Sequence, residues 1–301
     1  MQAPSFGCFM GTRAINERGK PMISRGKGRT LIYHVCIIGF GLILLYPLLW
    51  MISSSFRTDA DIFNSVGFWP ETFVFENFTQ GWAGLSGVTF TRFFLNSFFL
   101  VGMNMIGTVF SCSFAAYAFA KKEFVLKKLW FVLMLGTMML PIHVTLVPTY
   151  IMFNYLNWID TFFPLIVPSF LGFTGFFIFM LTQFMRNIPK EIDEAAEIDG
   201  CNSWNHYFRI ILPISLPAVI TTCIFSFIWT WNDFFSQMIY LTNIRLFTVG
   251  LALRQFVDAT GQSSWGALFA MNTLSLIPLF LIFVFLQKYL VEGVMSGSIK
   301  G

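Results

Sequence analysis

Residues 188–213 read IPKEIDEAAEIDGCNSWNHYFRIILP and form a polar stretch between two long apolar runs. Pro189 suits the first position of a helix, because its missing N–H has no helical partner there in any case. Glu191, Asp193 and Glu194 fall in the opening turns, where the positive end of the helix dipole favours carboxylates. The stretch therefore predicts a helix that begins at its amino end.

The second half of the stretch predicts a turn and another helix. Gly200 is expected to end the first helix, since glycine adopts the left-handed conformation that closes many helices. Ser203 suits the cap of a short helix over 204–211, and Pro213 suits the first turn of the next element. The prediction is a helix, a tight turn and a helix that lie along a membrane face.

The composition around this stretch is that of an integral membrane protein. The chain has 301 residues, of which 56% are hydrophobic, 19% aromatic and 11% charged. A soluble domain has about 25% charged residues, and the mean hydropathy here is +0.69. Five scattered cysteines show no paired spacing, so neither a disulfide nor a metal site is expected: Cys8, Cys36, Cys112, Cys201 and Cys223.

The apolar runs predict an all-α polytopic fold with six transmembrane helices, because a membrane helix needs about 20 apolar residues. The expected spans are approximately 31–53, 93–119, 129–152, 163–185, 214–240 and 267–291. Together they define a six-span transmembrane domain over 31–291. It is preceded by a basic arm, 1–30, and followed by a short tail, 292–301.

The basic residues predict the orientation of these spans. Fifteen Lys and Arg lie on the side of the N-terminus and four lie opposite, namely Arg57, Arg92, Arg245 and Arg254. Lys and Arg are enriched in cytoplasmic loops. Both termini and the stretch 188–213 are therefore expected in the cytoplasm. The net charge of +4 indicates membrane topology and no nucleic-acid partner.

The polar stretch resembles the EAA loop of binding-protein-dependent ABC importer permeases at Glu194, Ala195, Ala196, Gly200, Ile210, Leu212 and Pro213. In that family the loop is a coupling helix that sits in a groove of the ATPase subunit. The resemblance implies ATPase-coupling roles for these seven residues and for Asp199. Glu194 offers a charge to a basic partner, and the small alanines allow a close approach.

The resemblance extends over nearly the whole chain. Within the family, the sequence is most similar to maltose-type carbohydrate importers. FRTDADIF after the first span, AYAFAK at the end of the second, MMLP, TWND and the terminal GSIKG all fit in order and spacing. The tail resembles that of the smaller maltose permease subunit, which reaches between two ATPases. It implies ATPase contacts for Gly297, Ser298, Lys300 and Gly301. The chain departs from the family at His143, where Gln is common, and at Cys201, where Ala is usual.

This resemblance implies that the chain lies in the bacterial inner membrane and has several partners. They are a second permease subunit, two cytoplasmic ATP-binding subunits and an extracytoplasmic sugar-binding protein. The chain has no G-x-x-x-x-G-K-[ST] phosphate loop and no H-E-x-x-H motif, so it is not expected to be an enzyme. No cofactor is expected on the chain itself, and ATP and Mg are expected on the partner ATPases.

Polar side chains within spans are candidates for a substrate pathway, since they are costly in lipid unless they face a cavity or a partner. Prolines at 141 and 148 interrupt the third span around His143. In the fifth span, tryptophans beside amide and carboxylate groups suit sugar recognition or anchoring at the interface. The candidates are His143, Tyr150, Asn154, Trp229, Asn232, Asp233 and Asn272.

Two alternatives to a sugar importer stay open. One is a permease of the same mechanism for a non-sugar solute, such as a peptide, polyamine or phosphate ester. The other is a membrane enzyme or channel with a coincidental loop, although an enzyme would need facing ionisable residues within its spans. The sequence does not name the sugar, its charge or its length.

Overall fold

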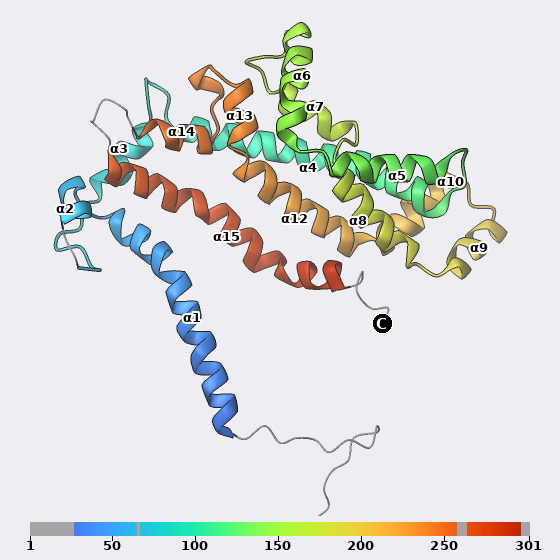
Figure 1. Cartoon of the computed structure of the whole chain (residues 1–301), viewed down its shortest axis with the longest axis horizontal. Helices are drawn as coiled ribbons and strands as arrows, with labels where there is room; N and C mark the ends of the chain where they lie inside the picture. The colour runs from blue at the N-terminus through green and yellow to red at the C-terminus, as the bar shows by residue number, and fades with distance from the viewer. Residues whose placement is uncertain (1–26, 65–66, 258–263, 296–301) are drawn as a thin grey trace, which may run out of the picture. The chain divides into compact units, whose positions relative to one another are not determined.

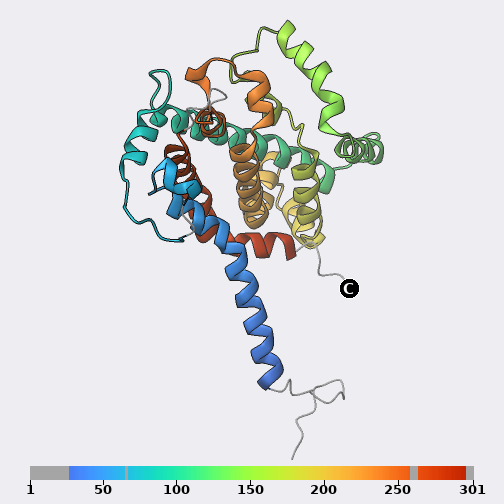
Figure 2. The same ribbon diagram turned by 60° about the vertical axis from the view of Figure 1, so that its left-hand side comes forward.

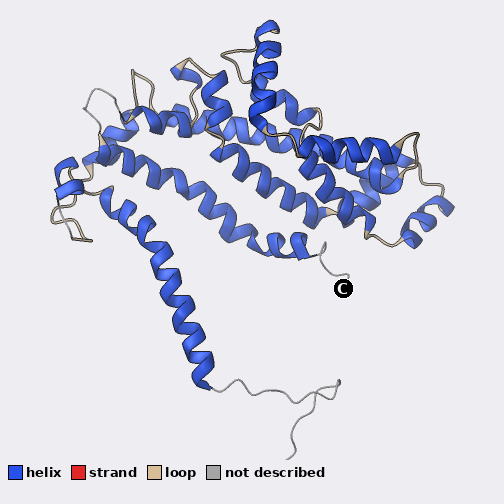
Figure 3. Cartoon of the chain, in the orientation of Figure 1, coloured by secondary structure: helices blue, strands red, loops and turns tan. Residues whose placement is uncertain are grey.

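The computed structural model describes residues 27–64, 67–257 and 264–295, and this part of the chain folds into helices joined by loops, without a strand (Figures 1 and 3). The helices, in chain order, are α1 (Lys27–Ser54), α2 (Asp59–Asn64), α3 (Glu76–Ala83), α4 (Phe90–Lys121), α5 (Lys127–Met138), α6 (Ile142–Tyr155), α7 (Phe163–Phe170), α8 (Gly175–Arg186), α9 (Lys190–Ile198), α10 (Ser203–Asn205), the π-helix η1 (His206–Ile211), α11 (Leu212–Ile214), α12 (Leu216–Asn232), α13 (Phe235–Tyr240), the 3-10 helix η2 (Ile244–Leu246), α14 (Val249–Gln255) and α15 (Trp265–Met295).

The chain divides into two compact units, which meet in sequence between Met51 and Ile52. The first unit is described from residue 27 and consists of α1, an apolar helix that contains Pro47. A proline inside a membrane helix is tolerated where neighbouring groups satisfy the freed backbone carbonyl. The stretch Leu31–Ser54 is long and apolar enough to cross a membrane.

The second unit is organised around three long helices. α12 packs against α4 on one side and against α15 on the other, and α7 and α8 pack along α4. Figure 1 shows α12 between α4 and α15, and the turned view in Figure 2 shows the same three helices adjacent. α4 therefore packs against helices from both the middle and the end of the chain, namely α7, α8, α12 and α14.

Two apolar clusters of buried residues hold this unit together. The first joins α4 to α8, η1 and the start of α12 through residues such as Cys112, Leu181 and Ile211, each 0% exposed. The second joins the beginning of α4 to α14 and the beginning of α15 through Phe90 and Met271, which are also 0% exposed. Each buried large side chain contributes about 1.5–3 kcal/mol in an aqueous reference state.

The prediction of several membrane-spanning helices is confirmed, with four to six spans. Four stretches are long and apolar enough to cross as they stand: Leu31–Ser54, Phe90–Lys121, Phe163–Arg186 and Trp265–Tyr289. Two further stretches qualify only as bent pairs of helices, α5 with α6 and 203–214 with α12. The predicted interruption of the third span is confirmed at Pro141 but not at Pro148, and the fifth span predicted over 214–240 is not a single helix.

The third predicted span, 129–152, is broken where α5 meets α6 at an angle of 99°. Pro141 lies at the break with an extended ψ of 135° and caps α6. Its ring disfavours helical geometry in Leu140 and removes a backbone donor, which explains the break. Pro148, by contrast, lies inside α6 without ending it.

The fifth predicted span, 214–240, is also not one helix. The axis bends by 75° at Ser215, and α12 begins at Leu216 with Pro217 in its first turn. The Pro217 ring would clash with the carbonyl of Pro213 in a continued helix, so the chain must bend there. α12 then ends at Asn232, where Asp233 turns extended before α13.

Candidate functional site

The candidate site begins at α9 and the turn that follows it. Gly200 has a φ of +71°, as expected for the residue that ends the helix. The N–H of Gly200 donates to the carbonyl of Glu197 at 3.0 Å, and the N–H of Cys201 donates to that of Ala196 at 2.9 Å. This pair of bonds is a Schellman motif, in which a left-handed residue satisfies the last helical carbonyls. The predicted role of Gly200 in ending the helix is confirmed.

The caps lie one residue before their predicted positions. Pro189 is the N-cap of α9 and Lys190 its first residue, whereas Pro189 was expected inside the helix. Asn202 caps the next helix, because its side chain accepts from the N–H of Asn205 at 2.9 Å. Ser203 was the predicted cap. Ser and Asn both cap well, so sequence alone does not choose between these neighbours.

The second helix is only partly α-helical, since 206–211 form the π-helix η1. Its wider turn places the adjacent side chains His206 and Tyr207 both inside the protein, at 7% and 3% exposure. In an α-helix such neighbours point in different directions. Bulges of this kind recur at functional sites, and a periodicity of 3.6 residues does not predict them.

The predicted coupling residues divide into an exposed set and a set that is buried or half-buried. Glu194, Ala195, Asp199, Gly200 and Pro213 are exposed. Ala196, however, is 5% exposed, and Ile210 and Leu212 pack on the first apolar cluster. The structure therefore places these three against their own chain, where they support the loop from within.

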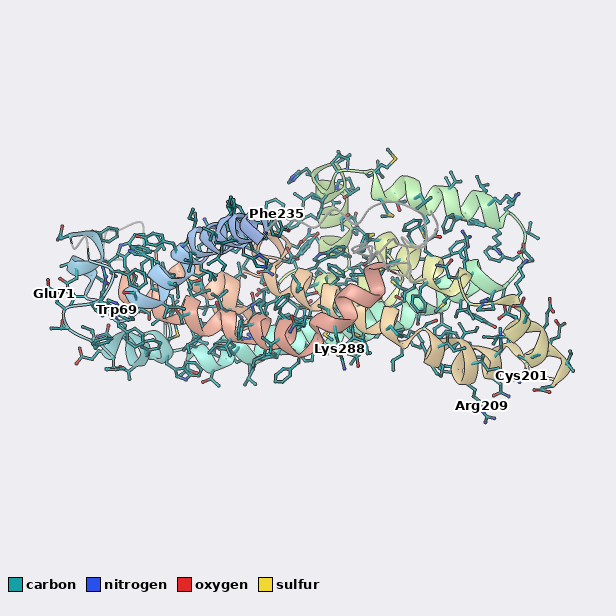
Figure 4. The ribbon with its side chains drawn as sticks, turned by 90° about the horizontal axis from the view of Figure 1, so that it is seen from below. Trp69, Glu71, Cys201, Arg209, Phe235 and Lys288 are labelled. Atoms are coloured by element: carbon teal, nitrogen blue, oxygen red, sulfur yellow. The ribbon has the colours of Figure 1, made fainter. Side chains whose placement is uncertain are left out.

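Three large apolar side chains on this loop were not singled out from the sequence. Ile198, Trp204 and Phe208 are 86%, 65% and 50% exposed. Three large apolar residues within the polar loop 188–213 could have been recognised in the sequence as candidates for an exposed apolar surface. Figure 4 shows the same region, with Cys201 and Arg209, at one end of the second unit and Trp69 and Glu71 at the opposite end.

A polar cluster attaches this loop to the end of α4. Lys121, the last residue of α4, places Nζ 2.7 Å from Oδ2 of Asp193 in α9 and also donates to the carbonyl of Ile188 at 3.1 Å. The hydroxyl of Tyr117 lies 3.0 Å from Nδ1 of His206. Sequence reasoning missed this cluster, because the partners lie 72 and 89 positions apart.

A cavity of about 150 Å³ lies between α4, α7, α8 and α12. Its lining combines hydroxyl and amide groups with two aromatic rings: Asn104, Thr108, Leu165, Pro168, Ser169, Thr174, Phe177, Ser226, Trp229 and Thr230. The side chain of Asn104 donates to the carbonyl of Leu100. The amide oxygen of Asn104 and the hydroxyls of Thr108 and Ser226 have no hydrogen-bond partner among the described residues. A cavity with these groups can accept water or a hydroxylated ligand.

Of the predicted pathway residues, only Trp229 lines this cavity. His143 makes an edge contact with Phe235, and Tyr150 stacks on Tyr240 with ring centroids 6.3 Å apart. The amides of Asn232 and Asn272 donate to carbonyls of their own helices.

The remaining two candidates also lie away from the cavity lining. Asp233 accepts from the N–H of Ser236 at 3.0 Å and so starts α13, while Asn154 is exposed. The seven candidates therefore do not converge on one pocket. A role for each in substrate passage stays a prediction.

Two further predictions lie partly outside the structure. The tail residues Gly297, Ser298, Lys300 and Gly301 lie beyond the described residues, as does most of the arm 1–30. Within the described ranges, no three His, Cys, Asp or Glu side chains gather as a metal site.

The profile of the family described as "Binding-protein-dependent transport system inner membrane component" matches residues 107–296. This chain belongs to that family. The permease is therefore a multi-pass membrane protein of an ABC transport system, and its family membership agrees with the resemblance carried by the EAA loop.

Relatives of this permease cover nearly its whole length. It is 36% identical over 288 residues to "Probable ABC transporter permease protein YurM" of Bacillus subtilis, covering 95% of this chain and 94% of that protein. It is 32% identical over 276 residues to "Trehalose/maltose transport system permease protein MalG" of Thermococcus litoralis, covering 91% and 98%. "Diacetylchitobiose uptake system permease protein NgcG" of Streptomyces coelicolor is 26% identical over 271 residues, covering 89% and 88%.

The fold of the permease also matches a solved structure. A chain of a bacterial ABC transporter involved in the import of the acidic polysaccharide alginate superposes with a TM-score of 0.77, covering 90% of this chain and 99% of that chain. The sequences are 21% identical, so this similarity concerns the fold.

Proposed function

We propose that this permease subunit takes up an oligosaccharide delivered by an extracytoplasmic binding protein, driven by ATP hydrolysis on two partner subunits. The observation that carries the proposal is the exposed end of α9, closed by Gly200, in a chain of this family. Relatives named for trehalose and maltose, diacetylchitobiose and arabinooligosaccharides support the substrate class. A second permease subunit completes the proposed assembly in the bacterial inner membrane, with both termini in the cytoplasm.

The proposed mechanism is alternating access. Closure of the ATPase pair moves α9, and this motion opens the spans to the extracytoplasmic side, where the sugar enters. Such coupling requires that the ATPase groove binds α9 differently in its two states, because a ligand shifts an equilibrium only by its differential affinity. Glu194 and Asp199 are exposed carboxylates on this surface, and they suit a basic groove.

The cavity beside Trp229 is the proposed passage for hydroxylated solutes. Trp229 and Phe177 provide ring faces, and Asn104, Thr108 and Ser226 provide polar atoms. Sugar rings stack on aromatic faces while their hydroxyls form hydrogen bonds. His143, Tyr150, Asn154, Asn232, Asp233 and Asn272 are proposed to contact substrate only outside this cavity.

The first test is co-purification from native membranes in a mild detergent, followed by mass spectrometry of the accompanying chains. We expect an ATP-binding subunit, a second permease and a binding protein. ATP hydrolysis is then measured with maltose, chitobiose, arabinose and alginate oligosaccharides as probes. Isolation of this chain alone would contradict the proposal, and stimulation by a peptide or polyamine would favour the non-sugar alternative.

The second test reverses one charge at each end of the second unit. Glu194→Lys is expected to leave the complex assembled and hydrolysing ATP but to reduce sugar uptake at least about tenfold, within the usual range of coupling energies. Glu71→Lys is the matched control, because Glu71 lies at the opposite end. Uptake by Glu194→Lys at the wild-type level would contradict a coupling role.

A further inference from the structure

The attachment of α9 to α4 depends on a buried ammonium group. The Lys121 side chain is 5% exposed and lies 2.7 Å from the Asp193 carboxylate, whose side chain is 25% exposed. A buried charge is strongly destabilising when its partner is removed, because it keeps its desolvation penalty without compensation. Lys121 therefore holds α9 through Asp193 more firmly than a surface ion pair would.

The same carboxylate lies beside a second group on the loop. Nε2 of His206 lies 3.1 Å from Oδ1 of Asp193, although the two atoms are not aligned as a hydrogen bond. On its other side, Nδ1 of His206 lies 3.0 Å from the hydroxyl of Tyr117. Asp193 is thus placed between α4 and the π-helix.

Contacts to the loop repeat along one face of α4. Tyr117 contacts His206, Lys121 contacts Asp193, and the hydroxyl of Ser113 lies 2.6 Å from that of Tyr207. The three α4 residues are spaced by four, which places them on one side of an α-helix. Both halves of the loop are therefore attached to the same face.

Asp193 differs from the other acids of α9. Glu191, Glu194 and Glu197 are exposed, and among the described residues none of them forms an ion pair. Asp193 points toward α4, whereas those three remain available to solvent or a partner. Among the acidic residues of α9, Asp193 is thus the one that attaches the helix to α4.

The helix that receives this attachment also reaches the cavity. Asn104 and Thr108 of α4 line the cavity beside Trp229. α4 contains no proline between these residues and Lys121. A displacement of α9 that is transmitted to Lys121 therefore reaches the cavity wall without passing through a break in the helix.

We propose that Asp193 is a positioning residue for coupling, which with Lys121 and His206 makes α9 and α4 move together. The inference rests on the proposed function, since it assigns to this cluster the transmission of motion from the ATPase to the cavity. Asp193 does not contact the ATPase in this proposal. It determines how much of the α9 displacement the transmembrane helices receive.

The test uses the co-purified complex in proteoliposomes and measures sugar uptake per ATP hydrolysed. The probe is the oligosaccharide from the panel above that stimulates wild-type hydrolysis most. Asp193→Asn is expected to lower this ratio about tenfold, and Asp193→Lys is expected to lower it further. Glu191→Gln is the matched control on the same helix and is expected to leave the ratio unchanged.

The reversed pair separates a specific ion pair from general damage. Lys121→Asp combined with Asp193→Lys is expected to bring the ratio back to within about threefold of wild type, because contacting residues couple in double-mutant cycles. A wild-type ratio in Asp193→Asn would overturn the proposal. A reversed pair no better than Asp193→Lys alone would also overturn it.

A distance measurement tests the attachment without transport. Spin labels at Glu191→Cys in α9 and Glu123→Cys beyond α4, in a background without native cysteines, report how firmly the two elements are joined. Asp193→Asn is expected to broaden the distance distribution, and an unchanged width would overturn the attachment. Absence of an ATPase from the wild-type complex would contradict the proposed function. The distance measurement would still show whether Asp193 attaches α9 to α4.

Discussion

The two ends of α4 are held by different interactions. At the end that carries Lys121, an ion pair and hydroxyl contacts join α4 to the loop 188–213. At the other end, the amide of Asn96 donates to the carbonyls of Arg245 and Phe247 at 2.9 Å each, and the hydroxyl of Ser97 accepts from the N–H of Val249. The ion pairs of the described residues involve Lys121, Lys127 and His206, none of which lies at this second end.

This difference indicates a division of roles along one helix. Hydrogen bonds between uncharged amide and carbonyl groups, here buried or partly buried, fix a geometry and change little with ionic conditions. An ion pair at a boundary responds to charge substitution and to nearby charged partners. We therefore expect changes at the Asn96 end to alter stability alone, and changes at the Lys121 end to alter coupling as well as stability.

The largest effect is expected between the two ends, at Gly107. A Cβ there would lie 2.5 Å from Oγ of Ser169 and 2.6 Å from a ring carbon of Phe170 in α7. Gly107→Val should therefore separate α4 from α7 and cost about 3 kcal/mol, at the upper end of overpacking effects. The measurement is the melting temperature of the complex in detergent, followed by size-exclusion chromatography.

Gly102→Val is the matched control on the same helix. A Cβ at Gly102 has nothing within 4 Å, so this variant should melt near the wild type. Equal melting temperatures for the two variants would show that the close approach at Gly107 does not determine stability. A different contact in the middle of α4 would then have to account for the stability of the helix between its two ends.

A smaller effect is expected from Asn96→Leu. This change removes two hydrogen bonds and leaves the carbonyls of Arg245 and Phe247 without that donor, at a cost of about 2 kcal/mol. The melting temperature should fall, while sugar uptake per ATP in the surviving complex should stay at the wild-type value. Leu95→Ala is the control, since Leu95 is 59% exposed.

Loss of coupling without loss of stability in Asn96→Leu would reverse the proposed division of roles. A different pattern is expected for Asp193→Asn, which leaves the buried Lys121 ammonium without its partner: stability falls, and the surviving complex also transports less sugar per ATP. Measuring stability and sugar uptake per ATP in both variants therefore tests whether the two ends of α4 have different roles.

The smallest effect is expected at Asp160, which binds the segment that precedes the two partners of Asn96. Its Oδ1 accepts from the N–H groups of Thr242 and Asn243 at 3.0 and 2.8 Å. Desolvation raises the pKa of Asp160, but the hydrogen bonds from Asn243 and Thr242 outweigh it, so the pKa lies below its ordinary value of 3.8. At this partly exposed position, Asp160→Asn should cost less than about 1 kcal/mol at pH 7.

The pH dependence of this effect follows from the sign of the shift. A lowered pKa in the folded state gives a contribution to stability that is present above the unfolded value and lost as the pH falls through the folded value. The difference in melting temperature between wild type and Asp160→Asn should be constant near neutrality and shrink below pH 3.8. A difference that grows on acidification would contradict the assignment.

The sequence predicted the parts of this molecule that depend on local chemistry. Gly200 had to end a helix because few residues adopt a positive φ, and the apolar runs had to form helices in a membrane. Glu194 is exposed, while its predicted coupling role stays a prediction. These features are determined by a residue and its near neighbours.

Other features depended on contacts between distant segments. Lys121 and Asp193 are 72 positions apart, and either residue alone reads as an ordinary charge at a helix end. The π-helix over 206–211 has no periodic signature. Pro141 and Pro217 were visible as prolines, but bends of 99° and 75° depend on the packing of the flanking helices. The cavity beside Trp229 required four helices at once.

The length of α4 has a mechanical consequence. Its 32 residues make a helix about 48 Å long at 1.5 Å per residue, whereas the hydrocarbon core of a bilayer is about 30 Å thick. In the proposed mechanism, the hydrogen bonds of Asn96 fix one end of this helix, and α4 tilts about that end. A tilt of about 5° would then move the Lys121 end by about 3 Å, given the rise of 1.5 Å per residue over that distance. A small angular change at the Asn96 end thus corresponds to a full atomic diameter at the loop 188–213.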